Sequence, residues 1–105
     1  MTWFTASLFF RGTHSSPDER EPLWEESLRL VDASSQEDAL AKANAMGKSL
    51  ELSYRVSTSD SVAWSFIKVE RVIALDVETF RAGEEIFSRF LRNGEAESLL
   101  TPFKE

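Results

Sequence analysis

The chain has 105 residues, of which 42% are hydrophobic and 29% are charged, with a net charge of −6 and no cysteine. This length fits one domain, and the composition excludes disordered, collagen-like and membrane-spanning chains. The lack of cysteine excludes disulfides, thiolate metal sites and cysteine nucleophiles, and it fits a reducing compartment. Because an excess of Lys and Arg supplies most of the affinity for phosphate backbones, the acidic charge argues against nucleic acid as a partner. We therefore expect a single cytoplasmic α+β domain over residues 1–105, with neither nucleic acid nor membrane as a partner.

Two strands open the predicted fold. Residues 3–10 are rich in strand formers and apolar on both faces, which predicts a central strand or one covered by a second subunit. Residues 23–31 alternate between apolar and polar side chains, which predicts one buried face and one wet face. The expected buried side carries Trp24, Leu28 and Leu30.

One helix is predicted from Ser34 to Gly47. Ser34 and Glu37 have the spacing of a capping box, in which a hydroxyl and a carboxylate each satisfy a free backbone N–H. Gly47 is the residue expected to end the helix, because glycine adopts the left-handed conformation of a C-terminal cap. The stripe expected to face a sheet consists of Ala39, Leu40, Ala43 and Met46.

A hairpin is predicted next, from residues 50–56 and 62–75. The first strand alternates cleanly, and its expected buried side carries Leu50, Leu52, Tyr54 and Val56. In the second strand the apolar parity switches near Phe66 and Ile67, which predicts a bulge or bend at that point.

The last predicted strand covers residues 84–91, and the tail from about residue 93 is expected to be a short helix or a loose end. The element order is then β-β-α-β-β-β, which indicates an α+β fold: a mainly antiparallel sheet of about five strands with one helix packed on one face. One helix cannot cover five strands. The other face must be partly polar, curled on itself or covered by a second subunit.

Four segments carry a resemblance that spans nearly the whole chain. They are W-F-x-x-S-L-F-F at 3–10, L-W-E-E-S-L-R-L-V at 23–31, A-x-S-x-E-D-A-L-A-K-A at 33–43 and G-x-E-I-F-S-R-F-L at 83–91. In this order they resemble the small bacterial family called domain of unknown function 4288. The resemblance implies a bacterial, stand-alone cytosolic protein, and it implies no catalytic residues, because that family has no established activity.

No catalytic, metal or cofactor site is predicted. His14 is the only histidine, and we interpret it as a solvated loop residue, because one His without clear partners builds neither a triad nor a metal site. The acidic group does not have the spacing of a calcium loop, so we interpret it as solvated; it comprises Asp18, Glu19, Glu21, Glu25 and Glu26.

Glu26 is the exception in that group. It shares parity with Trp24 and Leu28, so we expect it to be a partly buried charge that needs an arginine partner. The candidates for that partner are Arg29, Arg55, Arg71 and Arg89.

The aromatic residues exceed what one helix can hide, since the chain has eight Phe and three Trp. Our first hypothesis is a non-enzymatic interaction or accessory module, either a homodimer or a binder of another protein in the manner of an immunity-type inhibitor. The alternative is a small-ligand binder with an aromatic pocket, and an enzyme that uses Glu26 with an arginine has the least support. The candidate interface or pocket residues are Trp3, Trp24, Tyr54, Trp64, Phe66, Phe87 and Arg89.

Overall fold

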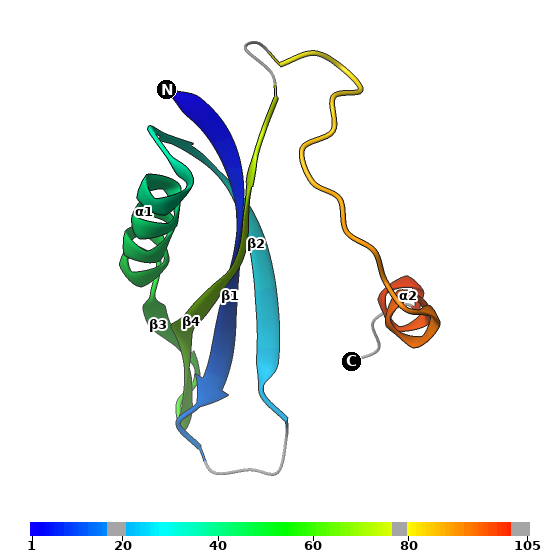
Figure 1. The fold of residues 1–105 in the computed structure, drawn as a ribbon. Coiled ribbons are helices and arrows are strands. Elements are labelled where there is room, and N and C mark those ends of the chain that lie inside the picture. Colours follow the sequence, from blue (N-terminus) through cyan, green and yellow to red (C-terminus); the bar gives the residue numbers. More distant parts are fainter. Residues whose placement is uncertain (17–20, 77–79, 102–105) are drawn as a thin grey trace.

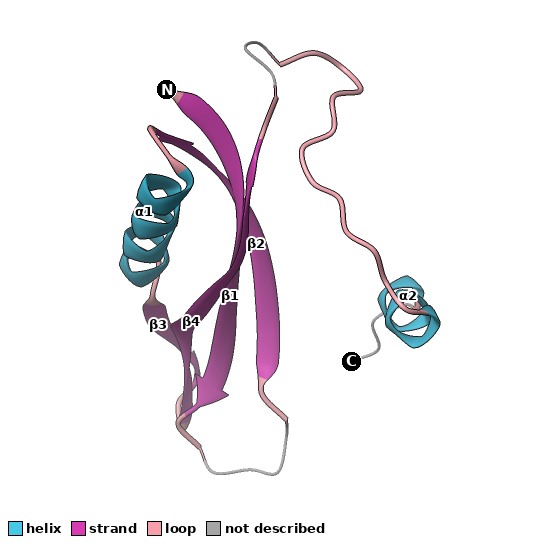
Figure 2. Cartoon of the chain, viewed as in Figure 1, coloured by secondary structure: helices cyan, strands magenta, loops and turns pink. Residues whose placement is uncertain are grey.

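The computed structural model describes residues 1–16, 21–76 and 80–101 (Figure 1). In these ranges the fold is α+β, and a twisted antiparallel sheet separates α1 from the C-terminal segment (Figure 2). The sheet has four strands in the order β2-β1-β4-β3, so the expectation of about five strands and one helix is wrong in number. The elements are β1 (Thr2–His14), β2 (Leu23–Ala33), α1 (Gln36–Ser49), β3 (Leu52–Ser57), β4 (Asp60–Ala74) and α2 (Asn93–Leu100).

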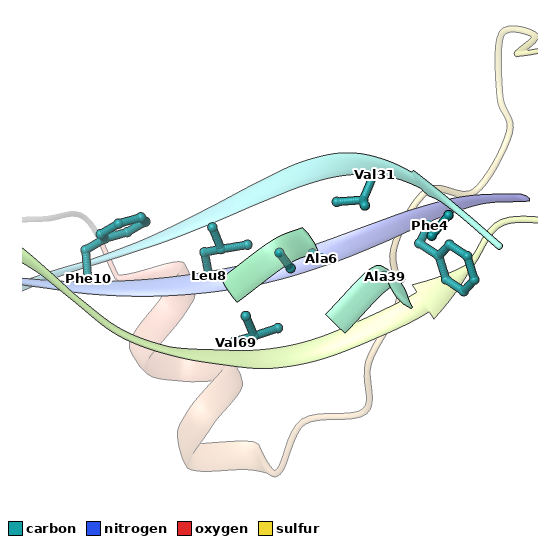
Figure 3. Packing of buried hydrophobic residues seen from close by; sticks show 9 residues of the cluster. Phe4, Ala6, Leu8, Phe10, Val31, Ala39 and Val69 are labelled. Carbon is teal, nitrogen blue, oxygen red and sulfur yellow. The ribbon is translucent and has the colours of Figure 1, made fainter. Parts of the chain in front are cut away.

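β1 is a central strand, as its apolar character predicts, and it pairs with β2 on one side and with β4, the other inner strand, on the other. Its even-numbered side chains face α1 and form the core with β2, β4 and the helix (Figure 3). Its odd-numbered side chains face the opposite side, where even the polar Thr5 and Ser7 are buried. Both faces of the strand are therefore covered within one chain.

The predicted irregularity in β4 is confirmed. Phe10 pairs with Phe66 and Phe9 pairs with Lys68, so Ile67 is an extra residue in β4. This extra residue reverses the parity of β4, and so allows apolar side chains on both sides of it to reach the core.

α1 begins one residue later than the predicted capping pair. The cap is Ser35, whose hydroxyl accepts a hydrogen bond from the Asp38 N–H at 3.0 Å. The Asp38 carboxylate reaches back and accepts from the Ser34 N–H at 3.0 Å, and this bond holds the pKa of Asp38 below its ordinary value. Ser34 and Glu37 are thus not the capping pair, because Ser35 and Asp38 have the same spacing one residue along the chain.

Gly47 does not end the helix, which continues to Ser49 with Leu50 as its cap residue. Among the described glycines only Gly83 has a positive φ, so Gly47 is not in the conformation of a glycine cap. Its role is steric, because a Cβ built at Gly47 would lie 2.4 Å from the ring of Phe66. The missing side chain lets α1 approach β4 closely.

Residues 84–91 do not form the predicted fifth strand. Residues 80–92 form an extended segment without helix or strand, here called the strap, on the face of the sheet opposite α1 (Figure 1). Strap carbonyls accept hydrogen bonds from side chains of the sheet instead of joining a backbone ladder. Although its composition is typical of a strand, the strap covers one face of the sheet and does not extend its edge.

α2 follows the strap and exposes its leucines at 99 and 100. In the described ranges α2 packs on neither α1 nor the sheet. Neither described helix has the length and apolar character that crossing a membrane requires.

The predicted burial of two strands is wrong. On β2, Trp24, Leu28 and Leu30 are 49%, 43% and 48% exposed, because α1 covers the opposite face, where Val31 and Ala33 are buried. All of β3 is exposed, since this strand lies at the far edge of the sheet. The exposed apolar residues of β3 are Leu52, Tyr54 and Val56.

Replacement of Gly47 tests the close packing of α1 on β4. We expect Gly47→Ala to destabilise the protein by roughly 1–3 kcal/mol, because the added methyl group forces the Phe66 ring against Phe10. Gly94→Ala is the matched control: Gly94 is also helical, but nothing lies within 4 Å of its missing Cβ. Urea unfolding should show a lower midpoint only for Gly47→Ala; equal midpoints for the two variants would refute the steric role.

Candidate functional site

The strap is held on the sheet by polar side chains of β1 and β4. The Thr5 hydroxyl donates to the Ile86 carbonyl at 2.6 Å, and Arg71 Nη1 donates to the Ser88 carbonyl at 3.1 Å. At its start, the ring of Phe80 lies 6.0 Å from that of Trp3. These contacts fix the path of the strap over the central strands.

Glu26 connects β2 to both the central strand and the strap. Its Oε2 atom accepts a hydrogen bond from the Ser7 hydroxyl at 2.8 Å and lies 3.5 Å from Arg89 Nη1. The Glu26 and Arg89 side chains are 27% and 24% exposed, so the charge is shielded but not fully buried. Of the four arginines considered as partners, Arg89 is the one that pairs with Glu26.

Two guanidinium groups lie close to the ring of Phe87. The Arg71 and Arg89 groups are 5.6 and 5.8 Å from the centre of its ring, within the range of a cation–π interaction. Because these arginines also hold Ser88 and Glu26, the group is a clamp for the strap, and its charged members already have partners.

An exposed apolar surface lies along β2 on the strap side of the sheet. It consists of Trp24, Leu28 and Leu30, here called the β2 patch, and the guanidinium of Arg11 lies 5.6 Å from the centre of the Trp24 ring. The strap passes over β1 and leaves the patch in contact with solvent. Since β2 is also an edge strand, apolar side chains and unpaired backbone groups occur together there.

A cleft of about 410 Å³ lies on the other side of the sheet, beyond the C-terminal end of α1. Trp64 Nε1 donates to the Tyr54 hydroxyl at 3.1 Å in its wall, which orients both rings. Two charged side chains of β2, Glu25 and Arg29, complete an otherwise apolar lining. The apolar residues are Phe10, Leu50, Leu52, Tyr54 and Trp64.

His14 lies at the end of β1, and its Nδ1 atom is 2.6 Å from Asp60 Oδ2. This hydrogen bond, together with one from the Ser16 N–H, holds the pKa of Asp60 below its ordinary value. Of the acidic group considered as a metal site, Asp18 and Glu19 lie outside the described residues. Within the described ranges no three His, Asp or Glu side chains gather where they could hold a metal ion.

The sequence-predicted site residues do not converge on one place. Trp3, Phe87 and Arg89 lie with the strap, while Tyr54 and Trp64 lie in the cleft on the opposite side of the sheet. Two others lie apart from both groups: Trp24 is in the β2 patch, and Phe66 packs beneath α1. The candidates thus divide between a structural clamp and two exposed surfaces.

Sequence reasoning missed several residues of these sites. Thr5 and Ser7 carry a usable signal, because two hydroxyl residues two positions apart in a central strand must find buried partners. Glu25 and Arg29 carry no comparable signal, since alternating charges are ordinary on a wet strand face.

In a comparison with protein-family models, the family described as "Domain of unknown function (DUF4288)" matches residues 3–88. The chain belongs to this family. The matched range of DUF4288 holds the sheet and α1 and ends inside the strap, so Arg89 and α2 lie beyond it. Neither the search of curated proteins nor the search of solved structures gave a match.

Replacement of Glu26 tests how this DUF4288 chain holds its strap. Glu26→Ala leaves the Ser7 hydroxyl, in a residue that is 1% exposed, without its acceptor, and we expect a loss of about 1–2 kcal/mol of unfolding free energy. Glu26→Gln keeps an acceptor for Ser7 and loses only a partly exposed ion pair, so its loss should be the smaller one.

Urea unfolding and the rate of tryptic cleavage after Arg89 measure the two effects. Cleavage in the native state should be faster in Glu26→Ala than in Glu26→Gln, because the strap leaves the sheet more often. If both variants match the unmodified protein in stability and cleavage rate, Glu26 does not hold the strap.

Proposed function

We propose that this DUF4288 protein is a non-enzymatic protein-interaction module that acts as a homodimer. The observation that carries the proposal is the β2 patch: three large apolar side chains, each 43–49% exposed, on an 11-residue edge strand. Exposed apolar surface beside an open sheet edge favours association with another chain.

The dimensions of the chain support this proposal. Its radius of gyration is 16.7 Å, compared with about 13 Å for a compact domain of this length. Its accessible surface is 8089 Å², compared with roughly 5,900 Å² for a compact monomer of its mass. Because a standard interface buries about 800 Å² on each partner, the surplus is large enough to supply one.

The placement of the polar residues favours interaction over catalysis. Ser7, Glu26, Arg71 and Arg89 bond to one another or to the strap. A catalytic acid or base must instead be within reach of a substrate proton. The polar groups of the strap clamp are engaged in structure, whereas the exposed β2 patch is available to a partner.

Solution mass tests the homodimer. At tens of micromolar, light scattering should give twice the chain mass of 11.9 kDa. Leu30→Ser, in the β2 patch, should weaken the dimer about ten-fold, because it removes most of one apolar contact from each copy. Leu40→Ser is the matched control, since Leu40 is 44% exposed but lies on α1.

A strictly monomeric mass over this concentration range would refute the homodimer. Equal weakening by Leu30→Ser and Leu40→Ser would refute the β2 patch as its contact surface.

The cleft supports a second candidate function, the binding of a small ligand. Its volume of about 410 Å³ lies within the usual range for ligand sites, and its apolar lining with a few polar groups is typical of them. Arg29 and the paired rings of Tyr54 and Trp64 suit an aromatic carboxylate, because a guanidinium binds a carboxylate through two hydrogen bonds.

An NMR titration with 3-phenylpropionate tests this second candidate. The indole N–H signal of Trp64 should shift, while those of Trp3 and Trp24, outside the cleft lining, should serve as internal controls. No shift at millimolar ligand, or equal shifts of all three signals, would contradict a specific site.

A further inference from the structure

β2 has a charge pattern that is complementary to itself. Counting outward from Ser27, Glu25 lies two residues before it and Arg29 two residues after it, both on the α1 side of the sheet. Trp24 and Leu30 lie three residues before and after it, on the strap side. Ser27 therefore stands at the centre of two matched pairs, one charged and one apolar.

We infer that two copies of the chain pair antiparallel along β2 with Ser27 on the two-fold axis, so that Glu25 of each copy lies opposite Arg29 of the other. This inference rests on the proposed homodimer and specifies its contact. The two sheets become one continuous sheet, and both copies of α1 lie on the same side of it.

Symmetry restricts how the strands can align. Residues directly opposite each other in an antiparallel pair point to the same face of the sheet. When the two-fold axis is perpendicular to the sheet, a given residue points to the same face in both copies. Since side chains alternate between faces along a strand, the sequence numbers of two opposite residues must differ by an even number. One residue of β2 therefore lies directly opposite its own copy, and the two-fold axis passes midway between these two copies. An axis through a residue means this arrangement.

The charges of β2 distinguish between the central alignments. An axis through Glu26 places that residue opposite itself, and an axis through Arg29 places two arginines together. An axis through Leu28 pairs Glu25 with an apolar residue and Trp24 with an acidic one. Of these central alignments, the axis through Ser27 alone sets Glu25 against Arg29, twice, with no like charges opposite each other.

The charged side chains are available for this contact. Within the described part of the chain, Glu25 has no ion pair or hydrogen bond, and Arg29 has one bond, from Nε to the Ser27 hydroxyl at 3.0 Å. The terminal nitrogens of Arg29 remain for a carboxylate of the second copy. Charges on edge strands commonly prevent pairing with other chains, but opposite charges placed symmetrically select one partner and one alignment.

The apolar residues fit the same alignment. Trp24 of each copy lies opposite Leu30 of the other, so each of these two members of the β2 patch packs beside an apolar side chain of the second copy. Leu28 lies opposite Glu26, whose carboxylate is already held by Ser7 and Arg89. The alignment therefore leaves no charged group opposite a like charge on the strap side either.

Charge exchange tests the alignment through the dimer dissociation constant. Glu25→Arg and Arg29→Glu should each weaken the dimer by about ten-fold or more, because each replaces two attractive pairs with two repulsive ones. The double variant E25R/R29E restores both pairs in exchanged positions and should dimerise like the unmodified protein. Glu37→Arg on α1 is the control for the change in net charge.

A mixture of the two single variants gives an independent readout. At positions 25 and 29, Glu25→Arg carries two arginines and Arg29→Glu carries two glutamates, so together they should form a heterodimer visible by sedimentation velocity. A dimer insensitive to either single variant, or a double variant that stays monomeric, overturns this alignment and leaves the homodimer standing. A monomeric unmodified protein overturns both proposals.

Discussion

The whole structure depends on the burial of β1 from two sides. Its even-numbered residues need an apolar cover, and its odd-numbered residues include the hydroxyls of Thr5 and Ser7, which need hydrogen bonds once water is excluded. α1 supplies the first cover. The strap and Glu26 supply the second, because the Ile86 carbonyl and the Glu26 carboxylate accept from these two hydroxyls. The strap thus completes the burial of β1, although the apolar core itself is formed by the sheet and α1.

The α1 side depends on small residues. Ala39, Ala43 and Gly47 are the buried residues of the helix, and they let its backbone approach the sheet closely. A narrow helix packs tightly but covers little area. It reaches β1, β4 and one end of β2, so the rest of both edge strands stays in water. The exposure of Leu52 and Tyr54 on β3 follows from this limited cover, whereas the β2 patch lies on the other face, where the strap leaves it in solvent.

The helices and strands could be predicted from the sequence, but the segments that pack on each face of the sheet could not. Alternation located β2 and the hairpin, and the parity switch located the irregularity at Ile67. Alternation separates two faces of a strand without indicating which of them a helix will cover, and so Trp24 was assigned to the wrong environment. Side chains such as Ile86 and Phe87 favour a strand, but a strand forms only where the segment runs along a sheet edge. Here Thr5 and Arg71 bond to backbone carbonyls of the strap and hold it over the face of the sheet.

The candidate site was predictable to a similar degree. Parity and charge together identified Glu26 as a carboxylate in need of an arginine, and Arg89 was among the four candidates. The sequence alone could not choose between them, because Arg89 reaches Glu26 only after the strap has folded back over the sheet. The cleft combines residues from α1's end and all four strands, so no short motif could mark it.

The two proposed activities share one strand and are therefore not independent. Glu25 and Arg29 line the cleft, and in the proposed dimer the same two side chains face the second copy. A carboxylate ligand and a partner carboxylate would compete for the Arg29 guanidinium. If a ligand binds without displacing the second copy, residues of that copy would become part of the lining of the cleft. By linkage, whichever relation holds must be reciprocal: the factor by which dimerisation changes ligand affinity equals the factor by which the ligand changes dimer affinity. β2 is thus the element through which this fold can connect a binding event on one side of the sheet to the assembly of two chains.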